Sequence, residues 1–459
     1  MWYNRAMKRR KKAPMLTELI HDGANDILKI MKAAKPESLN MERYLSWPEI
    51  LYRKAPDGLT TEQWWLGIKL HRAQARQDIP LYSAKGQAFS FAPTQYVQQY
   101  LHLIDRKGGN MVLTDANEIF CDRERDKYLL TSLEEEAIMS SMMEGAVVTR
   151  SEARQIIRDN RLPKNEHERM VINNYLTMKM ILENKDKPLT PAFILSLHRS
   201  MVEGTLKTPE KAGALRGAEE KVYIEDVRTG DIVHMPPAAD ELPKRLEAIC
   251  LFANGENEGK YYIHPVIRAI ILHFQLAYDH PFVDGNGRTA RALFYWCMLK
   301  AGYWLFEFIS ISRDIFNHPR YYYEAFLNTE EDENDLNYFI INQLKTILNS
   351  INDLIEHVRQ KKDDKNTYHH ALEWGFPSLN SRQKQVLLYF IHHPDTYTSV
   401  TAHCHTYNVV RQTARTDLNK LEKLGLLYSE NISREFIYRP KPNLENLIRK
   451  TAAELTDIG

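Results

Sequence analysis

The sequence predicts a mainly α-helical protein, with a helical core that carries one β-hairpin, an N-terminal region and a separate C-terminal domain. Apolar residues recur with helical spacing through most of the 459 residues. The alternation of apolar and polar residues that is typical of strands is rare, and within the core it is confined to one short segment. A chain of this length can bury more than one hydrophobic core, so one function need not explain all of it.

The composition indicates a protein without membrane spans. The 61 Lys and Arg residues nearly balance the 60 Asp and Glu residues, which gives a net charge of +1. No apolar stretch approaches the roughly 18 residues that a membrane span needs. The N-terminus is basic, but no apolar segment with a cleavage site follows it, so we expect a cytoplasmic protein. The four cysteines lie far apart, at positions 121, 250, 297 and 404, which argues against a zinc site and a disulfide framework.

Residues 1–125 form an N-terminal region rich in aromatic residues, and its role is not indicated by any motif. Turn formers such as Pro56-Asp57-Gly58 separate its segments. Large aromatic side chains belong more often to a core than to a binding surface, so we expect most of them to be buried. These aromatic residues are Trp47, Trp64, Trp65, Phe89, Phe91, Tyr96 and Tyr100.

Residues 126–355 have a helical pattern with one strand-like interruption, from Lys221 to Met235. Two apolar runs there flank a turn at Thr229-Gly230, which predicts a β-hairpin. A lone hairpin in a helical domain suggests a flap. The two runs are Val222, Tyr223 and Ile224 before the turn, and Ile232 and Val233 after it.

The densest group of chemically active residues is the run from His280 to Arg291. A predicted helix over 265–279 leads into it and another begins near Asn286, so we expect a glycine-rich loop that opens onto a helix N-terminus. A helix start leaves backbone N–H groups unpaired and carries partial positive charge. The N–H groups of Gly285, Asn286 and Gly287 can therefore face a phosphate.

The charged side chains of the same run suit phosphate chemistry. Arg288 and Arg291 share one face of the first helical turn and can both reach phosphates with forked, permanently charged donors. Asp284 is a hard oxygen ligand of the kind that holds Mg²⁺ together with substrate phosphates. His280 has an ordinary pKa of ~6.5 and suits a general base that acts on a hydroxyl.

Other interpretations of this run exist. Asp284-Gly285 and Asn286-Gly287 are also the dipeptides of tight hairpin turns, although the helical flanks argue against a hairpin. An EF-hand loop that began at Asp279 would put Pro281 and Val283 at ligand positions, and a Walker loop would need Gly-Lys followed by Ser or Thr. The chemistry of the residues alone leaves a phosphate site and a structural turn both open.

The run HPFVDGNGRTAR resembles the Fic motif, HPFx(D/E)GNGRxxR, at every specified position. The resemblance extends over roughly 130–350 and includes the lead-in helix from His264 and the later Asn334-Asp335-Leu336. It implies a helical Fic core that transfers AMP from Mg-ATP to a protein hydroxyl. The implied roles are general base for His280, Mg²⁺ ligand for Asp284, phosphate binding for Gly285, Asn286, Gly287, Arg288 and Arg291, and apolar anchor for Phe282.

A second motif lies upstream. A capping box at Ser132–Glu135 predicts a helix that begins near 133, on which Ser140 and Glu144 share a face, with Gly145 next. Alone this pattern is weak, and an exposed glutamate is the alternative. Beside a Fic motif it resembles the inhibitory motif (S/T)xxxE(G/N), in which Glu144 would pair bidentately with Arg291 and deny the γ-phosphate of ATP its partner. In some relatives this glutamate also helps to remove AMP, so de-AMPylation is a further candidate activity.

The predicted hairpin also resembles a Fic feature. The family's flap pairs with the main chain of a target as an added strand, which would place the modified side chain over His280. Val222, Tyr223 and Ile224, with Ile232 and Val233, would then dock the target. Gly213-Ala214-Leu215-Arg216, just before the hairpin, is similar to a family feature as well.

After an expected linker helix over 356–375, residues 376–445 resemble a winged helix-turn-helix domain. The resemblance rests on a predicted helix from Asn380 to His392, a second helix from Arg411, and the strand-like run 436–438. Many winged helices bind proteins rather than DNA, and the surplus of positive charge here is modest, so both partners stay open. The residues that would open a DNA recognition helix are Arg411, Gln412, Thr413 and Arg415.

The sequence thus favours an autoinhibited protein adenylyltransferase that uses Mg²⁺ and ATP to modify a Ser, Thr or Tyr hydroxyl, on a target protein or on itself. The alternative is a DNA-binding transcriptional regulator whose Fic core senses nucleotide or modifies the protein itself. The expected partners are ATP and a target protein, with DNA under the alternative. No membrane partner is expected, and a homodimer is one candidate assembly.

Overall fold

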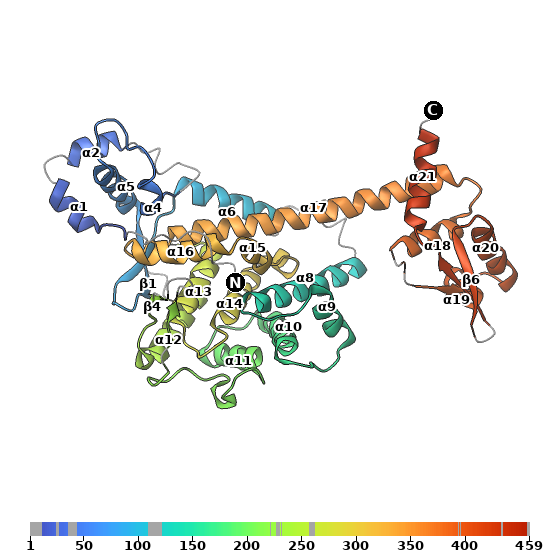
Figure 1. Ribbon diagram of the computed structural model, residues 1–459, viewed down its shortest axis with the longest axis horizontal. Helices are drawn as coiled ribbons and strands as arrows, with labels where there is room; N and C mark the ends of the chain where they lie inside the picture. Colours follow the sequence, from blue (N-terminus) through green and yellow to red (C-terminus); the bar gives the residue numbers. More distant parts are fainter. Residues whose placement is uncertain are drawn as a thin grey trace. The chain divides into compact units, whose positions relative to one another are not determined.

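The computed structural model shows a mainly helical chain, as predicted (Figure 1). The chain divides into two compact units, Met1–Leu354 and Ile355–Gly459, and the boundary lies inside helix α17 (Asn337–Gly375). Every helix in the described ranges is too short or too polar to span a bilayer. The structure describes residues 12–23, 27–34, 44–108, 122–220, 222–225, 230, 232–256, 262–392, 394, 396–432 and 435–456.

The N-terminal part of the first unit consists of helices and a two-stranded hairpin. The helices are α1 (Leu16–Gly23), α2 (Ile27–Ala33), α4 (Trp47–Ile50), α5 (Thr61–Ala75) and α6 (Gln95–Gly108). Strands β1 (Gln77–Tyr82) and β2 (Ala88–Phe91) pair antiparallel. The tryptophans and phenylalanines named above are buried, as predicted, whereas Tyr96 and Tyr100 are only partly buried.

This N-terminal part is packed on the core through buried groups. Lys69 Nζ lies 2.7 Å from Oδ1 of Asp332, and Arg72 Nη1 lies 3.6 Å from Oδ2 of the same carboxylate. Buried charges are tolerated where they are paired in this way. The ring of Phe89 on β2 also meets the ring of Phe274 edge-on, with centroids 5.2 Å apart. The N-terminal region is therefore built into the first unit and is not a tethered appendage.

The core of the first unit is centred on two helices, α13 (Pro265–Asp279) and α14 (Asn286–Lys300), most of whose side chains are buried. They contact each other along their length and lie among the other core helices (Figure 1). The surrounding helices are α8 (Asp122–Met143), α9 (Arg150–Asp159), α10 (Glu166–Asn184), α11 (Pro191–Val202), α12 (Leu242–Asn254), α15 (Ile311–Asn317), α16 (Pro319–Glu331) and the first part of α17.

Helix α8 begins earlier than predicted. It starts at Asp122, so the prediction of a start near 133 is wrong. The hydroxyl of Ser132 does not cap a helix but donates a hydrogen bond to the Phe308 carbonyl at 2.9 Å. The Ser132 hydroxyl, which the local pattern predicted to cap a helix, thus bonds to a residue distant in the sequence, and α8 continues past Ser132. Ser140 lies in the last turn of α8, and Glu144 is the first residue after its end.

The predicted β-hairpin is present. Strands β3 (Ile224–Glu225) and β4 (Ile232–His234) pair antiparallel. Val222 and Tyr223 come just before β3, and Thr229 of the predicted turn lies outside the described residues. Strand β3 includes only the last residue of the first predicted run, whereas β4 contains both residues of the second run and extends to His234.

One end of the hairpin is fastened to the core by His234. Its Nε2 donates to the Tyr278 carbonyl at 2.7 Å, and its Nδ1 lies 2.8 Å from a carboxylate oxygen of Glu330. Burial lowers the pKa of His234, but the Glu330 carboxylate and the Tyr278 carbonyl outweigh it and leave the pKa raised. These contacts favour the protonated form of His234, which fixes the C-terminal end of β4 to the core.

The second unit is a small domain of helices and one antiparallel sheet, in which the central strand β7 (Glu435–Pro440) pairs with β5 (Thr398–Ser399) on one side and β6 (Leu427–Ile432) on the other. Its core includes Leu387, Leu418, Leu421 and Tyr438. Residues 356–375 are the continuation of α17. After α17 the elements are α18 (Ser381–His392), β5 (Thr398–Ser399), α19 (Val400–Tyr407), α20 (Arg411–Lys423), β6 (Leu427–Ile432), β7 (Glu435–Pro440) and α21 (Leu444–Thr456).

Candidate active site

A short loop, residues 280–285, joins α13 to α14 and turns the chain sharply. His280 ends α13 in the left-handed conformation, with φ of 46°, and Gly285 precedes α14 with φ of 79°. The left-handed conformation is uncommon for a residue with a side chain, so the fold fixes His280 at some cost in backbone strain. The first backbone N–H groups of α14 have no partner within the helix, which leaves a positive helix end beside this loop.

Buried side chains hold the loop in shape. Phe282 N–H donates to Asn286 Oδ1 at 2.9 Å, and Asn286 Nδ2 donates to Phe282 O at 2.8 Å. The buried Phe282 ring stacks on the imidazole of His198, with centroids 3.7 Å apart. His198 Nδ1 accepts from the Gly213 N–H, so its Nε2 carries the proton and donates to the Asp284 carbonyl at 2.9 Å. Phe282 is the anchor that the sequence predicted.

The His280 side chain is arranged as a proton acceptor. Its Nδ1 lies 3.1 Å from the Ala277 carbonyl, which can only accept, so Nδ1 donates and the lone pair is left on Nε2. Burial lowers the pKa of His280 more than the Ala277 hydrogen bond raises it, so the pKa lies below the ordinary value of 6.5. The imidazole is therefore neutral at pH 7.

Asp284 is the carboxylate of the loop, and its side chain is 52% exposed. Its Oδ1 accepts from the Gly285 N–H at 2.6 Å, and its Oδ2 lies 3.3 Å from Nη2 of Arg288. Among the described residues, no group of three or more His, Cys, Asp or Glu side chains gathers as a metal cage. An exposed single carboxylate beside a helix N-terminus fits Mg²⁺, which is bound by one or two carboxylates together with substrate phosphates and water.

Arg291 is buried and contacts the last turn of α8. Its Nε donates to Ser140 Oγ at 2.8 Å, and its Nη2 donates to Ser140 O at 3.1 Å and to Glu144 Oε1 at 2.9 Å. The predicted bidentate pairing with Glu144 is therefore wrong in detail, because Ser140 takes the second edge of the guanidinium. Burial raises the pKa of Glu144, but Arg291 and Arg288 outweigh it, so the pKa is lowered and the carboxylate is charged.

Gly287 lies directly beneath the Glu144 carboxylate. A Cβ atom at position 287 would come within 2.1 Å of Glu144 Oε1 and 3.2 Å of Arg291 Nη1. The carboxylate thus reaches the first turn of α14 only because residue 287 has no side chain. Glu144 occupies the space beside the residues that the sequence predicted to bind phosphate.

Residues 188–298, which include this loop and the first residues of α14, match the model of the Fic/DOC family. This stretch of the chain is similar to a Fic domain. The comparison with curated relatives agrees. The chain is 32% identical to protein adenylyltransferase Fic of Nematostella vectensis over 122 aligned residues. These residues make up 27% of this chain and 26% of that protein.

The chain is also similar to protein adenylyltransferase Fic of Drosophila ananassae, with 33% identity over 132 aligned residues. These residues make up 29% of this chain and 22% of that protein. The chain thus spans about a quarter of the length of these curated relatives. The structure is also similar to the crystal structure of a Fic family protein from Desulfovibrio desulfuricans, with a TM-score of 0.51 and 18% sequence identity. The superposed region covers 76% of this chain and 97% of that one. This likeness shows a Fic-like fold.

Arg216 ties the Fic motif to the hairpin, a link that sequence reasoning missed. Its Nε donates to His280 O at 2.9 Å, and its Nη2 donates to Pro237 O at 2.5 Å. Its backbone N–H also donates to Pro281 O at 2.9 Å. The segment 213–216 resembled a family feature, but only the fold shows what Arg216 holds. The hairpin and the loop are therefore braced by one side chain.

The predicted hairpin residues are accessible. Tyr223 is 43% exposed, Ile224 38% and Ile232 52%. Val233 is partly buried, and His234 beyond it is buried. The hairpin thus presents apolar side chains and a short strand edge to solvent, while His234 ties the end of β4 to Tyr278 and Glu330.

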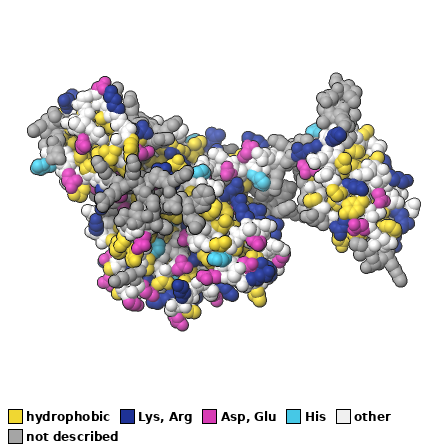
Figure 2. Space-filling model, viewed as in Figure 1, with side chains coloured by type: hydrophobic (Ala, Val, Ile, Leu, Met, Phe, Trp, Pro, Cys, Tyr) yellow, Lys and Arg dark blue, Asp and Glu magenta, His cyan; other side chains and the backbone are white. Residues whose placement is uncertain are grey.

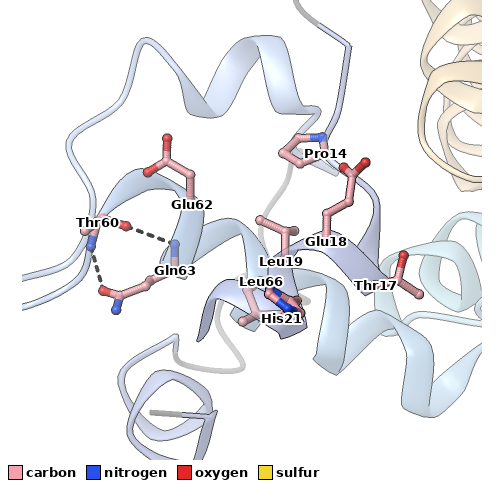
Figure 3. Close-up of a pocket in the computed structure, with 9 residues that line it drawn as sticks. All are labelled: Pro14, Thr17, Glu18, Leu19, His21, Thr60, Glu62, Gln63 and Leu66. Atoms are coloured by element: carbon pink, nitrogen blue, oxygen red, sulfur yellow. Dashed lines mark hydrogen bonds between the residues drawn. The ribbon is translucent and has the colours of Figure 1, made fainter. Parts of the chain in front are cut away.

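A surface groove in the N-terminal part is separate from these residues (Figure 3). It lies between α1 and the start of α5, where Thr60 and Gln63 form the N-terminal cap of α5. No residue of the Fic motif lines it, so it is not part of the candidate active site. The lining residues are Pro14, Thr17, Glu18, Leu19, His21, Thr60, Glu62, Gln63 and Leu66.

Proposed function

We propose that this protein is an autoinhibited protein adenylyltransferase, which transfers AMP from Mg-ATP to a hydroxyl of a target protein. One observation carries the proposal: a neutral His280 with a free lone pair lies beside the N-terminus of α14, together with Asp284, Arg288 and Arg291. A base, a metal ligand and two guanidiniums at one anion-binding helix end suit nucleotidyl transfer.

In the proposed reaction, His280 Nε2 accepts the proton of the target hydroxyl. The hydroxyl oxygen forms a bond to the α-phosphorus as the bond from that phosphorus to the bridging oxygen of the β-phosphate breaks. Pyrophosphate leaves, and the target carries AMP as a phosphodiester. The reaction needs no covalent intermediate on the protein. Much of the rate would come from holding the hydroxyl and the α-phosphate in line.

The start of α14 would bind the triphosphate. Backbone N–H groups of Asn286 and Gly287 face the phosphate oxygens, and Arg288 and Arg291 bind the outer phosphates. Asp284 would hold Mg²⁺, which when bound neutralises charge on the phosphates. In this structure the buried Arg288 side chain contacts Asp284 at 3.3 Å and donates to the Met201 carbonyl at 3.2 Å.

Glu144 would act as a brake. Its carboxylate pairs with Arg291 at 2.9 Å, and the same guanidinium is needed by the γ-phosphate. The two anions compete for one cation, so ATP binds productively only when Glu144 has moved away. Inhibition therefore follows from occupation of Arg291 and not from damage to His280.

The hairpin would hold the target. An extended segment of a target can pair with a strand edge of the hairpin through main-chain hydrogen bonds. Tyr223 and Ile232 supply apolar contacts beside that edge. Arg216 connects the backbone carbonyl of His280 to the carbonyl of Pro237, which follows the hairpin. A target segment bound to the hairpin would therefore be held at a fixed position relative to the His280 side chain.

The test is a labelling experiment with two forms of ATP. The Glu144→Gly variant is incubated with Mg²⁺ and ATP labelled at the α- or the γ-phosphate, alone and with a cell lysate. AMP transfer retains the α-label on protein and loses the γ-label, whereas a kinase would do the opposite. The proposal would be wrong if protein carried the γ-label, or if no protein carried either label.

The pH dependence of AMP transfer follows from His280. The base must be unprotonated, and burial holds its pKa below the ordinary 6.5. In the Glu144→Gly background, kcat/KM should therefore stay level from pH 8 down to about pH 6.5 and fall at lower pH, as His280 becomes protonated. Initial rates over this range measure the position of the acid limb.

A neighbouring carboxyl provides the control for this profile. Burial raises the pKa of Asp279 to about 6, although Arg245 opposes the rise. The Asp279→Asn variant should keep the acid limb in place if His280 is the titrating group. Loss of the limb in that variant would assign the pH dependence to Asp279 instead.

For the second unit we propose a winged helix that binds DNA. The element order is α18, β5, α19, α20, β6 and β7, and the three strands form one antiparallel sheet. At the start of α20, Arg411, Gln412 and Arg415 are exposed and Thr413 is partly exposed. An exposed helix start with two arginines is suited to phosphate and base contacts. Figure 2 shows Lys and Arg side chains interspersed with Asp and Glu side chains on the face turned to the viewer.

The DNA proposal predicts a particular salt dependence. Replacing Arg411 and Arg415 together by Ala should weaken DNA binding and reduce the slope of log K against log salt by about 2, one unit for each lost phosphate contact. Arg359, whose side chain is 69% exposed on α17, serves as the control for loss of a surface charge. An unchanged affinity in the double variant would favour a protein partner for α20.

A further inference from the structure

Side chains spaced four residues apart connect α8 to α14. Residues with this spacing lie on one face of a helix. The partners pair in opposite order along the two helices, so the helices run antiparallel where they meet. The spaced residues are Glu136, Ser140 and Glu144, from the second half of α8 to just beyond its end, and Tyr295, Arg291 and Gly287 on α14.

Three successive contacts follow from this arrangement. The Tyr295 hydroxyl donates to Glu136 Oε2 at 2.8 Å. One turn along each helix, Arg291 Nε donates to Ser140 Oγ at 2.8 Å. Beyond the end of α8, Glu144 Oε1 accepts from Nη2 of the same arginine at 2.9 Å. A shift of α8 along α14 would break all three contacts together, so the first contact helps to fix the place of Glu144.

The Glu136 carboxylate is buried, with 2% of the residue exposed, and it accepts four hydrogen bonds. Besides the Tyr295 hydroxyl, Oε2 accepts from Ser310 Oγ at 2.8 Å and from the backbone N–H of Ser312 at 3.2 Å. Oε1 accepts from Ser312 Oγ at 2.5 Å. A buried carboxylate is tolerated when donors such as these replace water, so movement of Glu136 away from them would be costly.

The donors around Glu136 come from other helices. Tyr295 is on α14, and Ser310 and Ser312 lie at the start of α15. The Tyr295 hydroxyl also accepts from the Ile311 N–H at 2.9 Å, which orients it. Burial, and then the Glu136 carboxylate, raise the pKa of Tyr295 well above its ordinary value, so the hydroxyl keeps its proton and donates it. Glu136 is therefore bonded to groups that lie outside α8.

We propose that Glu136 is a positioning residue of the brake: its four hydrogen bonds fix the register of α8 on α14 and thereby hold Glu144 against Arg291. Weakening these bonds would let the end of α8 leave Arg291 more often, without any change in Glu144 itself. The inference rests on the proposed function, because it assumes that Glu144 inhibits AMP transfer. It assigns a role to a residue outside the Fic motif and the inhibitory motif.

The test measures AMP transfer in two backgrounds. In the otherwise wild-type chain, Tyr295→Phe removes one hydrogen bond from Glu136 and should raise the initial rate about threefold or more, without exceeding the rate of Glu144→Gly. In the Glu144→Gly background the same substitution should leave the rate within about twofold, because no carboxylate is left to position. Lower rates in both backgrounds would show a merely structural role and overturn the inference.

Two further variants act on the same carboxylate. Glu136→Gln should raise the wild-type rate as Tyr295→Phe does, because an amide accepts hydrogen bonds more weakly than a carboxylate. Ser312→Ala removes the hydroxyl bonded to Oε1 and should act in the same direction. The matched control is Tyr303→Phe. It removes another buried hydroxyl that donates to a carboxylate, that of Asp105 on α6 at 2.5 Å, and should change neither rate.

Hydrogen exchange supplies a measure that does not depend on activity. Peptides that contain residues 137–146 report on the end of α8. The Tyr295→Phe variant should exchange there about threefold faster or more, and the control variant should not. Unchanged exchange and an unchanged rate would mean that other contacts fix α8, such as the bond from the Asn174 amide to the Ala137 carbonyl at 3.2 Å, and would overturn the inference.

The rate of Glu144→Gly separates failure of this inference from failure of the proposed function. If Glu144→Gly is no faster than the wild type, the brake is wrong and the inference falls with it. If Glu144→Gly is faster but Tyr295→Phe and Glu136→Gln are not, the brake stands and only the positioning role of Glu136 is wrong.

Discussion

The Glu144→Gly variant should transfer AMP about tenfold or more faster than the wild-type protein, because one charge-assisted hydrogen bond to Arg291 is removed. In this structure Glu144 Oε1 and Ser140 occupy both edges of the guanidinium. Removing the carboxylate leaves Arg291 one Nη2 donor free for phosphate. The initial rate of AMP incorporation, at equal protein and ATP concentrations, measures the effect.

The control for this variant lies on the same helix. Glu135 is a buried carboxylate of α8 that pairs with Arg154 at 2.9 Å and does not contact Arg291. Glu135→Gln should destabilise α8 without raising the rate. Glu144→Gln should release Arg291 in part, since an amide is a weaker acceptor than a carboxylate. Equal rates for the wild type and Glu144→Gly would refute the brake and leave the chemistry of His280 untouched.

The His280→Ala variant should lose AMP transfer by about 10³-fold or more, at the upper part of the range for removal of a general base. His280 has an imidazole lone pair beside the start of α14, and within the described part of the chain its side chain makes one hydrogen bond, to the carbonyl of Ala277 three residues earlier. The substitution is therefore expected to leave the fold and the ATP site intact. Rates are measured in the Glu144→Gly background.

Nucleotide binding supplies the check on this result. His280→Ala should bind Mg-ATP as tightly as its parent, because the proposed phosphate contacts come from Arg288, Arg291 and the start of α14. A large loss of ATP affinity would mean that the variant disturbs the loop and not the chemical step. Retention of more than about a tenth of the parent rate would show that His280 is not the base.

The local features of this protein could be predicted from its sequence. The core position of Phe282 was implied by the resemblance to the Fic motif. The helices before and after the 280–285 loop and the hairpin depend on periodicity and turn chemistry close to each residue. The site residues from His280 to Arg291 come together for the same reason, since they lie on one loop and one helical turn. Short-range patterns were sufficient there.

Long-range contacts could not be predicted in the same way. Helix α8 runs past Ser132, whose hydroxyl donates to the carbonyl of Phe308, a residue distant in the sequence. The second edge of Arg291 is taken by Ser140, and the link from Arg216 to His280 spans separate segments. Such pairings depend on how helices pack, which local spacing does not specify.

The most direct measurement is the intact mass of the purified protein after incubation with Mg-ATP. Three forms are compared: wild type, Glu144→Gly, and Glu144→Gly combined with His280→Ala. If a lysate protein is the target, the same comparison applies to that protein. We expect little added mass for wild type, added mass equal to AMP for Glu144→Gly, and none for the double variant. Added AMP in the double variant, or its absence from Glu144→Gly and from every lysate protein, would contradict it.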